Sequence, residues 1–164
     1  DVTVSVNMGK PKFKWNEIPL TKDIDPVDIN FSIRDLTLKK PFLVNIGNPH
    51  IIFFDDEIEK YDVESFGSLI ENDSLFPEKI NVSFAKLKSD NHIVLNVWER
   101  GAGKTNACGT AACATAVAGV EMGLIKNKVT VTLPGGDLEI YYKSSDNIIM
   151  TGPTEINFTD KYKL

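Results

Sequence analysis

Residues 98–115 read WERGAGKTNACGTAACAT, and this stretch organises the rest of the chain. It runs from the end of a predicted strand, through a glycine-rich loop, to Cys108 at the start of a helix of small residues. The first N–H groups of a helix have no acceptor within the helix, so they lower the pKa of a nearby thiol and bind carboxylates or oxyanions. We therefore interpret this stretch as one half of an active site.

The helix that follows, residues 107–122, consists almost entirely of small apolar residues. A helix with so little charge is expected to be buried on nearly all sides, and Gly123 is expected to end it. Alternating apolar residues predict strands at 2–8, 80–87, 93–98, 129–133, 138–142 and 148–151, with shorter ones within 29–38 and 42–54. A short surface helix is predicted after Asp62. Strands wrapped around one apolar helix form an α+β domain.

The composition indicates a single globular domain, with 164 residues and a net charge of −5. The negative charge argues against nucleic acid or an anionic membrane as a partner, and no apolar run reaches the length of a membrane span. Cys108 and Cys113 lie too far apart in one predicted helix for a disulfide, and no Cys or His spacing indicates a metal site. Reduced thiols suit a cytoplasmic protein. Because the chain opens at Asp1 directly into a strand, we expect it to be a processed product or part of a longer protein.

A second informative stretch is PFLVNIGNPHIIFFDD at residues 41–56. Its two apolar runs indicate buried strands, and the turn between them is expected to expose Asn48 and His50 at the end of a sheet. A lone histidine in such a place is more often structural than functional. The adjacent Asn48 and the rigid Pro49 favour a site, because together they fix two polar groups.

The remaining candidates are open on the residues alone. Asn81, taken singly, is interpreted as a solvent-facing residue of its strand. Glu99 and Arg100 form a surface ion pair as readily as part of a site. Cys108 is either a small core residue or a reactive thiol, and its position after a glycine loop favours the second; Cys113 is interpreted as a core residue.

Five motifs resemble those of diaminopimelate epimerase in order and spacing. They are GNPH at 47–50, VWERGAG at 97–103, ACGT at 107–110, LPGGDLEI at 133–140 and MTGP at 150–153. The resemblance covers essentially the whole chain but only the second half of that family, whose site lies between two similar halves. It implies an α+β fold in which a mixed, mostly antiparallel sheet is rolled around one buried central helix. It also implies that residues 1–164 form one domain whose tail, 154–164, packs on the absent first half.

The same resemblance implies a reaction: cofactor-independent epimerisation at the α-carbon of diaminopimelate, from the LL to the meso form, in bacterial lysine and cell-wall precursor biosynthesis. One cysteine from each half is then acid or base, so we expect this chain to need the missing half and to be inactive alone. A homodimer is an assembly that the resemblance allows. The catalytic residues it implies are Cys108, Glu99 and His50, and the substrate-binding residues are Asn48, Asn81, Glu99, Arg100, Gly109 and Thr110.

Three positions depart from the family pattern. Lys104 stands where the family usually has an acidic residue, and Asn106 and Ala111 also differ. We expect these changes to affect substrate positioning rather than the class of reaction. Two alternatives stay open: half of a proline-racemase-like amino-acid racemase, and a non-catalytic module that binds carboxylates at the helix start. Arg100 and the GNPH turn favour a substrate with a distal polar end over proline.

Overall fold

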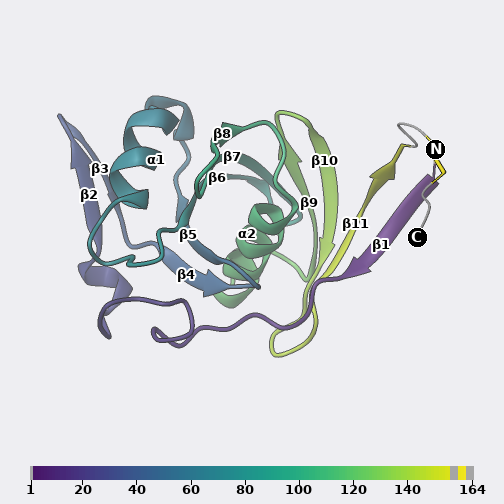
Figure 1. The fold of residues 1–164 in the computed structure, drawn as a ribbon, viewed down its shortest axis with the longest axis horizontal. Helices are drawn as coiled ribbons and strands as arrows, with labels where there is room; N and C mark the ends of the chain where they lie inside the picture. The colour runs from purple at the N-terminus through teal and green to yellow at the C-terminus, as the bar shows by residue number, and fades with distance from the viewer. Residues whose placement is uncertain (1, 156–158, 162–164) are drawn as a thin grey trace.

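The computed structural model describes residues 2–155 and 159–161, and within them a sheet of nine strands dominates the fold (Figure 1). Its strands lie in the order β1 (Val2–Asn7), β11 (Ile149–Thr154), β10 (Gly136–Tyr141), β9 (Lys128–Leu133), β7 (His92–Glu99), β6 (Asn81–Ser89), β5 (Pro49–Phe54) and β4 (Phe42–Asn45), while β8 (Gly103–Thr105) pairs with β7. The β5–β6 and β7–β9 pairs are parallel and the others are antiparallel. The predicted mixed, mostly antiparallel sheet is therefore confirmed.

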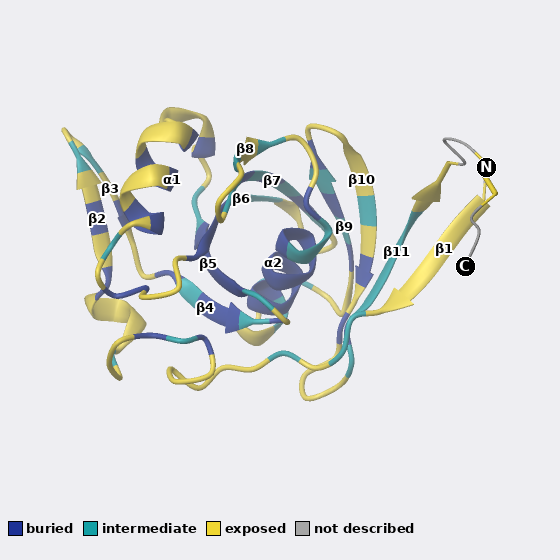
Figure 2. Ribbon diagram, in the orientation of Figure 1, coloured by how far each residue is buried: buried dark blue, intermediate teal, exposed yellow. Residues whose placement is uncertain are grey.

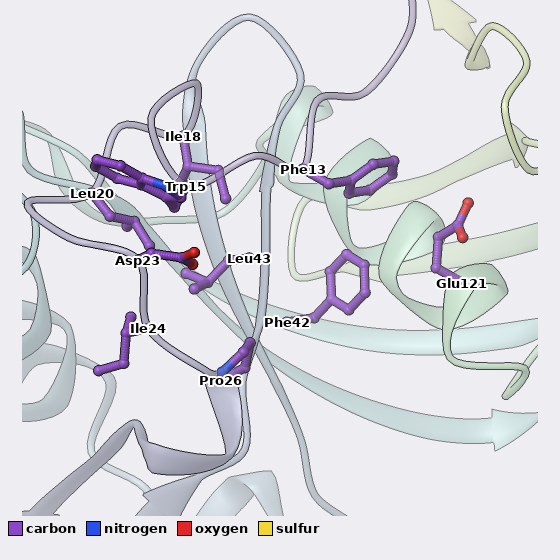
Figure 3. Close-up of a pocket in the computed structure, with 10 residues that line it drawn as sticks. All are labelled: Phe13, Trp15, Ile18, Leu20, Asp23, Ile24, Pro26, Phe42, Leu43 and Glu121. Carbon is purple, nitrogen blue, oxygen red and sulfur yellow. The ribbon is translucent and has the colours of Figure 1, made fainter.

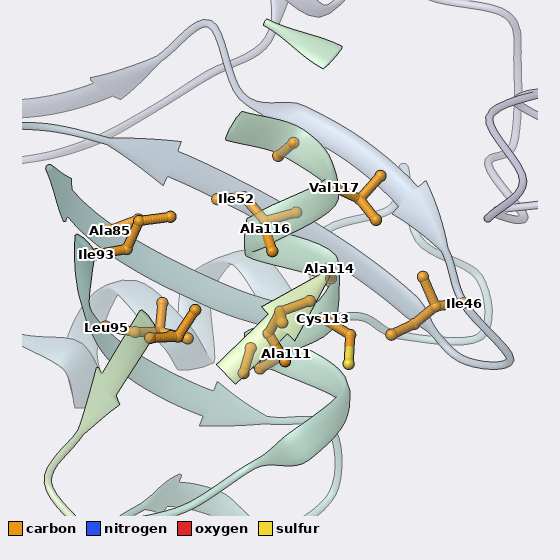
Figure 4. Packing of buried hydrophobic residues seen from close by; sticks show 14 of the residues in the cluster. Ile46, Ile52, Ala85, Ile93, Leu95, Ala111, Cys113, Ala114, Ala116 and Val117 are labelled. Atoms are coloured by element: carbon orange, nitrogen blue, oxygen red, sulfur yellow. The ribbon is translucent and has the colours of Figure 1, made fainter. Parts of the chain in front are cut away.

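Helix α2 (Gly109–Glu121) lies inside the curve of this sheet and contacts β4, β5, β6, β9 and β10. Its residues 111–119 are all buried, as Figure 2 shows, and Figure 4 shows the strand side chains packed around them. Small side chains permit this close packing: a Cβ added at Gly119 would lie 2.8 Å from Ile125 Cδ1. Gly123, with φ +70°, follows the helix in the left-handed conformation. The predicted α+β fold around one buried helix is confirmed.

The outer face of the sheet is covered as well over β5, β6 and β7. Helix α1 (Val63–Glu71) and the hairpin of β2 (Asn30–Ile33) and β3 (Leu36–Lys39) contribute to a second core there, and two short 3-10 helices, η1 (Pro26–Asp28) and η2 (Ile58–Lys60), lie in the connections. Because successive strand residues point to opposite faces, β6 sends Phe84 to this outer core and Ala85 to the core around α2. The central strands are thus fixed on both faces.

Helix α1 begins as predicted. The Asp62 side chain accepts a hydrogen bond from the Ser65 N–H at 3.2 Å, which satisfies one of the free donors of the first turn. Phe66 and Ile70 recur at helical spacing and are buried in the outer core. Among the described residues, no helix is both long and apolar enough to cross a membrane.

Two predictions about exposure are wrong. Strand β5 begins at Pro49, so His50 belongs to the strand rather than to an exposed turn, and it is 0% exposed. Asn81, predicted to face solvent when taken singly, lies opposite His50 in the parallel β5–β6 pair and is 3% exposed. Both errors have the same cause, because a central strand with a core on each face buries both of its alternating sets of side chains.

Strand β1 forms one edge of the sheet and is exposed along its whole length (Figure 2). It pairs antiparallel with β11, so that Val2 lies opposite Thr154. Of the predicted tail at 154–164, Thr154 belongs to β11, and residues 156–158 and 162–164 lie outside the described residues.

We expect Gly67→Ala to destabilise the fold, because α1 packs against β7 at this glycine. A Cβ there would lie 2.3 Å from Trp98 Cγ and 2.5 Å from Trp98 Cβ, so the helix or the indole must move. Such overpacking lowers the unfolding free energy by about 1 to 3 kcal/mol, measurable by urea titration. The control, Ser68→Ala on the exposed side of the same helix, should change it by less than about 0.5 kcal/mol. Equal effects of the two substitutions would contradict this packing.

Candidate active site

Cys108 occupies the N-cap position of α2, with an extended backbone (φ −150°, ψ 103°). It is 7% exposed and lines a cavity of about 170 Å³ at the start of the helix. The other lining residues are Ala107, Gly109, Leu133, Gly135, Gly136, Asp137, Leu138 and Pro153. Gly109 has Met150 against it, since an added Cβ would lie 3.0 Å from Met150 Sδ. The sulfur and the first residues of the helix therefore share one small cavity.

A chain of hydrogen bonds connects His50 to this sulfur. His50 Nε2 lies 2.8 Å from Asn48 Oδ1, Asn48 Nδ2 donates to Thr110 Oγ1 at 3.2 Å, and Thr110 Oγ1 lies 3.5 Å from Cys108 Sγ. Because an amide oxygen only accepts, His50 donates and carries its proton on Nε2. The Thr110 hydroxyl accepts from Asn48, and either it or the Cys108 thiol can donate in the contact between them. The first two bonds thus have a defined direction, from His50 to Asn48 and from Asn48 to Thr110, and Thr110 contacts Cys108.

His50 is a neutral imidazole in this environment. Burial, and to a smaller extent the positive charge of Arg100, lower its pKa from 6.5 to about 3. Its Nδ1 is buried and has no hydrogen-bond partner among the described residues. His50 therefore fixes Asn48 as an uncharged donor near neutral pH.

The pKa of Cys108 is raised, against the expectation from its place at a helix start. Burial is the largest cause, and the nearby Glu99 carboxylate adds to it; the Thr110 hydroxyl and the Ala111 N–H favour the thiolate but do not prevail. The Glu99 Oε1 itself accepts a hydrogen bond from Thr105 Oγ1 at 2.6 Å. The thiol is thus the favoured form of Cys108 in this chain.

Asn81 joins two turns that carry the other candidates. Its Nδ2 donates to the carbonyl oxygen of Pro49 at 2.9 Å, and its Oδ1 accepts from the Arg100 N–H at 2.8 Å. The exposed Arg100 side chain donates from Nη1 to the carbonyl oxygen of Glu78 at 3.1 Å. The structure thereby brings the sequence-predicted residues together near the start of α2: Asn48, His50, Asn81, Glu99, Arg100, Cys108, Gly109 and Thr110.

Two residues at this end of the sheet were not found from the sequence. Thr105 hydrogen-bonds Glu99, and nothing in a three-residue strand distinguishes it. Glu71 is buried and accepts hydrogen bonds from Trp98 and Gly101. The sequence could have indicated Glu71, because an acidic residue beside Ile70 on the apolar side of a helix is unusual and needs a partner.

Another cavity lies apart from these residues. It measures about 350 Å³ and is mostly apolar (Figure 3). Its lining residues are Phe13, Trp15, Ile18, Leu20, Asp23, Ile24, Pro26, Phe42, Leu43 and Glu121. No cysteine or histidine is among them, so it offers no acid/base pair of the kind found near Cys108. Within the described part of the chain, no group of three or more His, Cys, Asp or Glu residues is arranged to hold a metal ion.

Sequence comparisons match this chain to one family. A family model described as diaminopimelate epimerase matches residues 42–157. A diaminopimelate epimerase of Methylocella silvestris is 47% identical over 163 residues, which cover 96% of this chain and 56% of that protein. One of Erythrobacter litoralis is 48% identical over 153 residues, which cover 93% of this chain and 56% of that protein. The chain thus spans a little over half the length of these curated relatives.

Structure comparisons match the fold. A predicted epimerase from Pseudomonas aeruginosa has a TM-score of 0.56 at 15% identity, covering 96% of this chain and 59% of that chain. A hydroxyproline epimerase from Agrobacterium vitis also has a TM-score of 0.56, at 12% identity, covering 92% of this chain and 50% of that chain. At such low identities the likeness concerns the fold alone.

We expect His50 to stay neutral in the folded protein between about pH 8 and about pH 5. The protonation state of its ring can be measured by ¹⁵N NMR. Its folded pKa of about 3 lies below the ordinary 6.5, so the unfolded state takes up the proton first. This contribution to stability is present above pH 6.5 and is lost as the pH falls toward 3. His50→Gln should lose this part of the pH dependence and His92→Gln should retain it. A His50 titration centred near the ordinary value would contradict the prediction.

Proposed function

The chain belongs to the diaminopimelate epimerase family, and from this premise we propose that it provides one half of an enzyme that inverts the α-carbon of diaminopimelate between the LL and meso forms without a cofactor. The observation that carries the proposal is Cys108 at the head of the buried helix α2, beside Glu99 and Thr110. Its relatives are nearly twice as long, which supports a second half with its own proton-transfer group.

Inversion requires a base on one face of the carbon and an acid on the other. One thiol serves one face only, so the opposing group belongs to the other half. Since the thiol is the favoured form of Cys108, we assign it the acid role in one direction. The opposing base takes the α-proton, and the electron pair of the broken C–H bond stays on the substrate as an enediolate. Cys108 S–H then donates its proton to the carbon from the opposite face and becomes a thiolate, and the reverse reaction exchanges the two roles.

The start of α2 supplies the donors for the charge that develops on the substrate carboxylate. The N–H groups of Gly109 and Thr110 have no acceptor within the helix and lie at its positive end. A preorganised donor aimed at a developing oxyanion stabilises the transition state by about 3 kcal/mol. We assign these two N–H groups to the reacting carboxylate of diaminopimelate.

The distal end of the substrate is assigned to the polar residues around the two turns. Arg100 is exposed and uses Nη1 on Glu78, which leaves the rest of its guanidinium for a carboxylate. Asn48 is held beside Thr110 by His50, and Asn81 has a second amide hydrogen besides the one donated to Pro49. These groups suit the distal carboxylate and amine.

The same premise supports a wider arrangement. We propose that residues 1–164 act as one domain and that the tail at 154–164 packs on the missing half. We also propose that the whole enzyme works in the bacterial cytoplasm, in lysine biosynthesis. Both cysteines are free, which suits a reducing compartment.

We expect the chain to exchange the α-proton of diaminopimelate only when the second half is present. The test mixes the chain with the remaining part of the Methylocella silvestris relative in D₂O and follows deuterium at the α-carbon by NMR. Cys108→Ala should lower the conversion of the LL to the meso form at least about 100-fold, because inversion needs both proton-transfer groups. Cys113→Ala, in the fully buried middle of α2, is the matched control and should retain this conversion.

Each other outcome has a defined meaning. Binding of diaminopimelate without exchange would instead support a module that only captures carboxylates. Exchange of proline in preference to diaminopimelate would support the racemase alternative. Conversion of the LL to the meso form that survives Cys108→Ala would reject the role assigned to this thiol.

A further inference from the structure

The last residue of helix α1 is a buried carboxylate. Glu71 is 5% exposed, and it lies where the free carbonyl groups of the helix carry partial negative charge. A buried carboxyl group costs free energy unless its oxygens accept hydrogen bonds. Compensating contacts are therefore required, and Glu71 makes two.

Both oxygens of Glu71 accept hydrogen bonds from the segment between β7 and β8. Oε2 accepts from Trp98 Nε1 at 2.8 Å, and Oε1 accepts from the Gly101 N–H at 2.8 Å. Hydrogen bonds to an ionised acceptor are stronger than neutral ones. The two donors flank Glu99 and Arg100 in the sequence, so one carboxylate holds both ends of this two-residue segment.

The segment is a β-turn from Glu99 to Ala102. The Ala102 N–H donates to the Glu99 carbonyl oxygen at 3.1 Å, and Gly101 has φ +76°, as the third position of a type II turn requires. The turn's own hydrogen bond does not use the Gly101 N–H, which needs another acceptor. Glu71 provides that acceptor and thereby fixes the turn.

The two residues that lead into the turn, Trp98 and Glu99, point to opposite faces of the sheet. Trp98 packs on the outer core, against α1, where Gly67 leaves room for the indole. Glu99 is the next residue, so its side chain points to the inner face, where it lies near Cys108. A contact made on the outer face thus determines where an inner-face carboxylate lies.

We propose that Glu71 is a positioning residue of the candidate active site: it holds the segment from Trp98 to Gly101 so that Glu99 lies against the Cys108 sulfur. Glu71 acts through Glu99 and not by touching the substrate. The consequence for catalysis rests on the proposed function. The coupling of Glu71, Glu99 and Cys108 is measured on the chain by itself.

The test is the pH dependence of Cys108 alkylation by iodoacetamide, followed by peptide mass spectrometry. Because only the thiolate reacts, the midpoint of the rate against pH reports the pKa of Cys108. The titratable groups around this thiol are Glu99 from β7, Asp137 from β10, which lines the same cavity and accepts from Thr132 Oγ1 at 2.6 Å, and Cys113 from its own helix. Cys113 is fully buried and its pKa is raised to about 12, so it stays a neutral thiol throughout.

Glu99→Gln should lower the midpoint by about one pH unit, because it removes a carboxylate beside the sulfur. Glu71→Gln should lower it as well, since the amide has only one oxygen to accept from two N–H donors and the turn is released. The double variant should shift no further than Glu99→Gln alone, because both changes act through one carboxylate. Glu64→Gln, on the exposed side of the same helix, is the matched control and should leave the midpoint unchanged.

An unchanged midpoint in Glu71→Gln, or additive shifts in the double variant, would overturn the proposal. A residue that only stabilises the fold would lower the urea midpoint and leave the alkylation midpoint in place. If Glu71→Gln does not fold, Trp98→Phe decides, because it removes one donor and keeps an aromatic ring against Gly67. A lowered alkylation midpoint in that variant supports the proposal, and an unshifted one rejects it.

Deuterium exchange in the reassembled enzyme separates this proposal from the wider one. If exchange occurs and the Glu71→Gln substitution leaves the alkylation midpoint of Cys108 unchanged, only the positioning role of Glu71 is rejected. If Glu71→Gln lowers the alkylation midpoint but the reassembled enzyme shows no exchange, the coupling of Glu71 to Cys108 is supported and the proposed function is rejected.

Discussion

The close approach of the sheet to helix α2 is the constraint on which the rest of the structure depends. Residues 111–119 are buried on every side, and side chains larger than alanine or valine would push the surrounding strands apart. Since the helix is fixed along its length, its first turn is fixed too. Cys108 and the first N–H groups therefore hold one position relative to β5 and β7, whose ends carry the other polar residues. The packing of the core around α2 thus also determines the geometry of the site.

Local patterns in the sequence predict what local physics determines. The Asp62 cap, the end of α2 before Gly123 and the buried character of residues 107–122 follow from nearest neighbours along the chain. The burial of His50 and Asn81 does not. It arises because β5 and β6 are parallel neighbours joined through α1, with one core against each face. Such an arrangement is a long-range property, and a strand's alternation alone cannot report that its second face is covered.

The pKa of Cys108 likewise depends partly on local sequence and partly on long-range contacts. The sequence places a thiol at a helix start, where unpaired N–H groups favour the thiolate. In the folded chain, burial and the Glu99 carboxylate outweigh those donors and keep the sulfur protonated. The position of Glu99 in turn depends on a turn held by Glu71, which comes from a different element. Charge at the Cys108 sulfur is therefore determined by contacts between residues that lie far apart in the sequence.

The neutral state of His50 and Cys108 has a consequence for the proposed mechanism. His50 is uncharged near neutral pH, and as a hydrogen-bond donor it fixes the orientation of the Asn48 amide, which donates to Thr110. Cys108 is uncharged as well, so this half holds its proton ready and carries no strong base at the sulfur. A second half that closes over the cavity removes further water and favours the neutral thiol still more. The positive ammonium group of a bound amino acid acts in the opposite direction. In the proposed mechanism, substrate binding is therefore what allows Cys108 to give up its proton, and a chain without its substrate and partner keeps its thiol inactive.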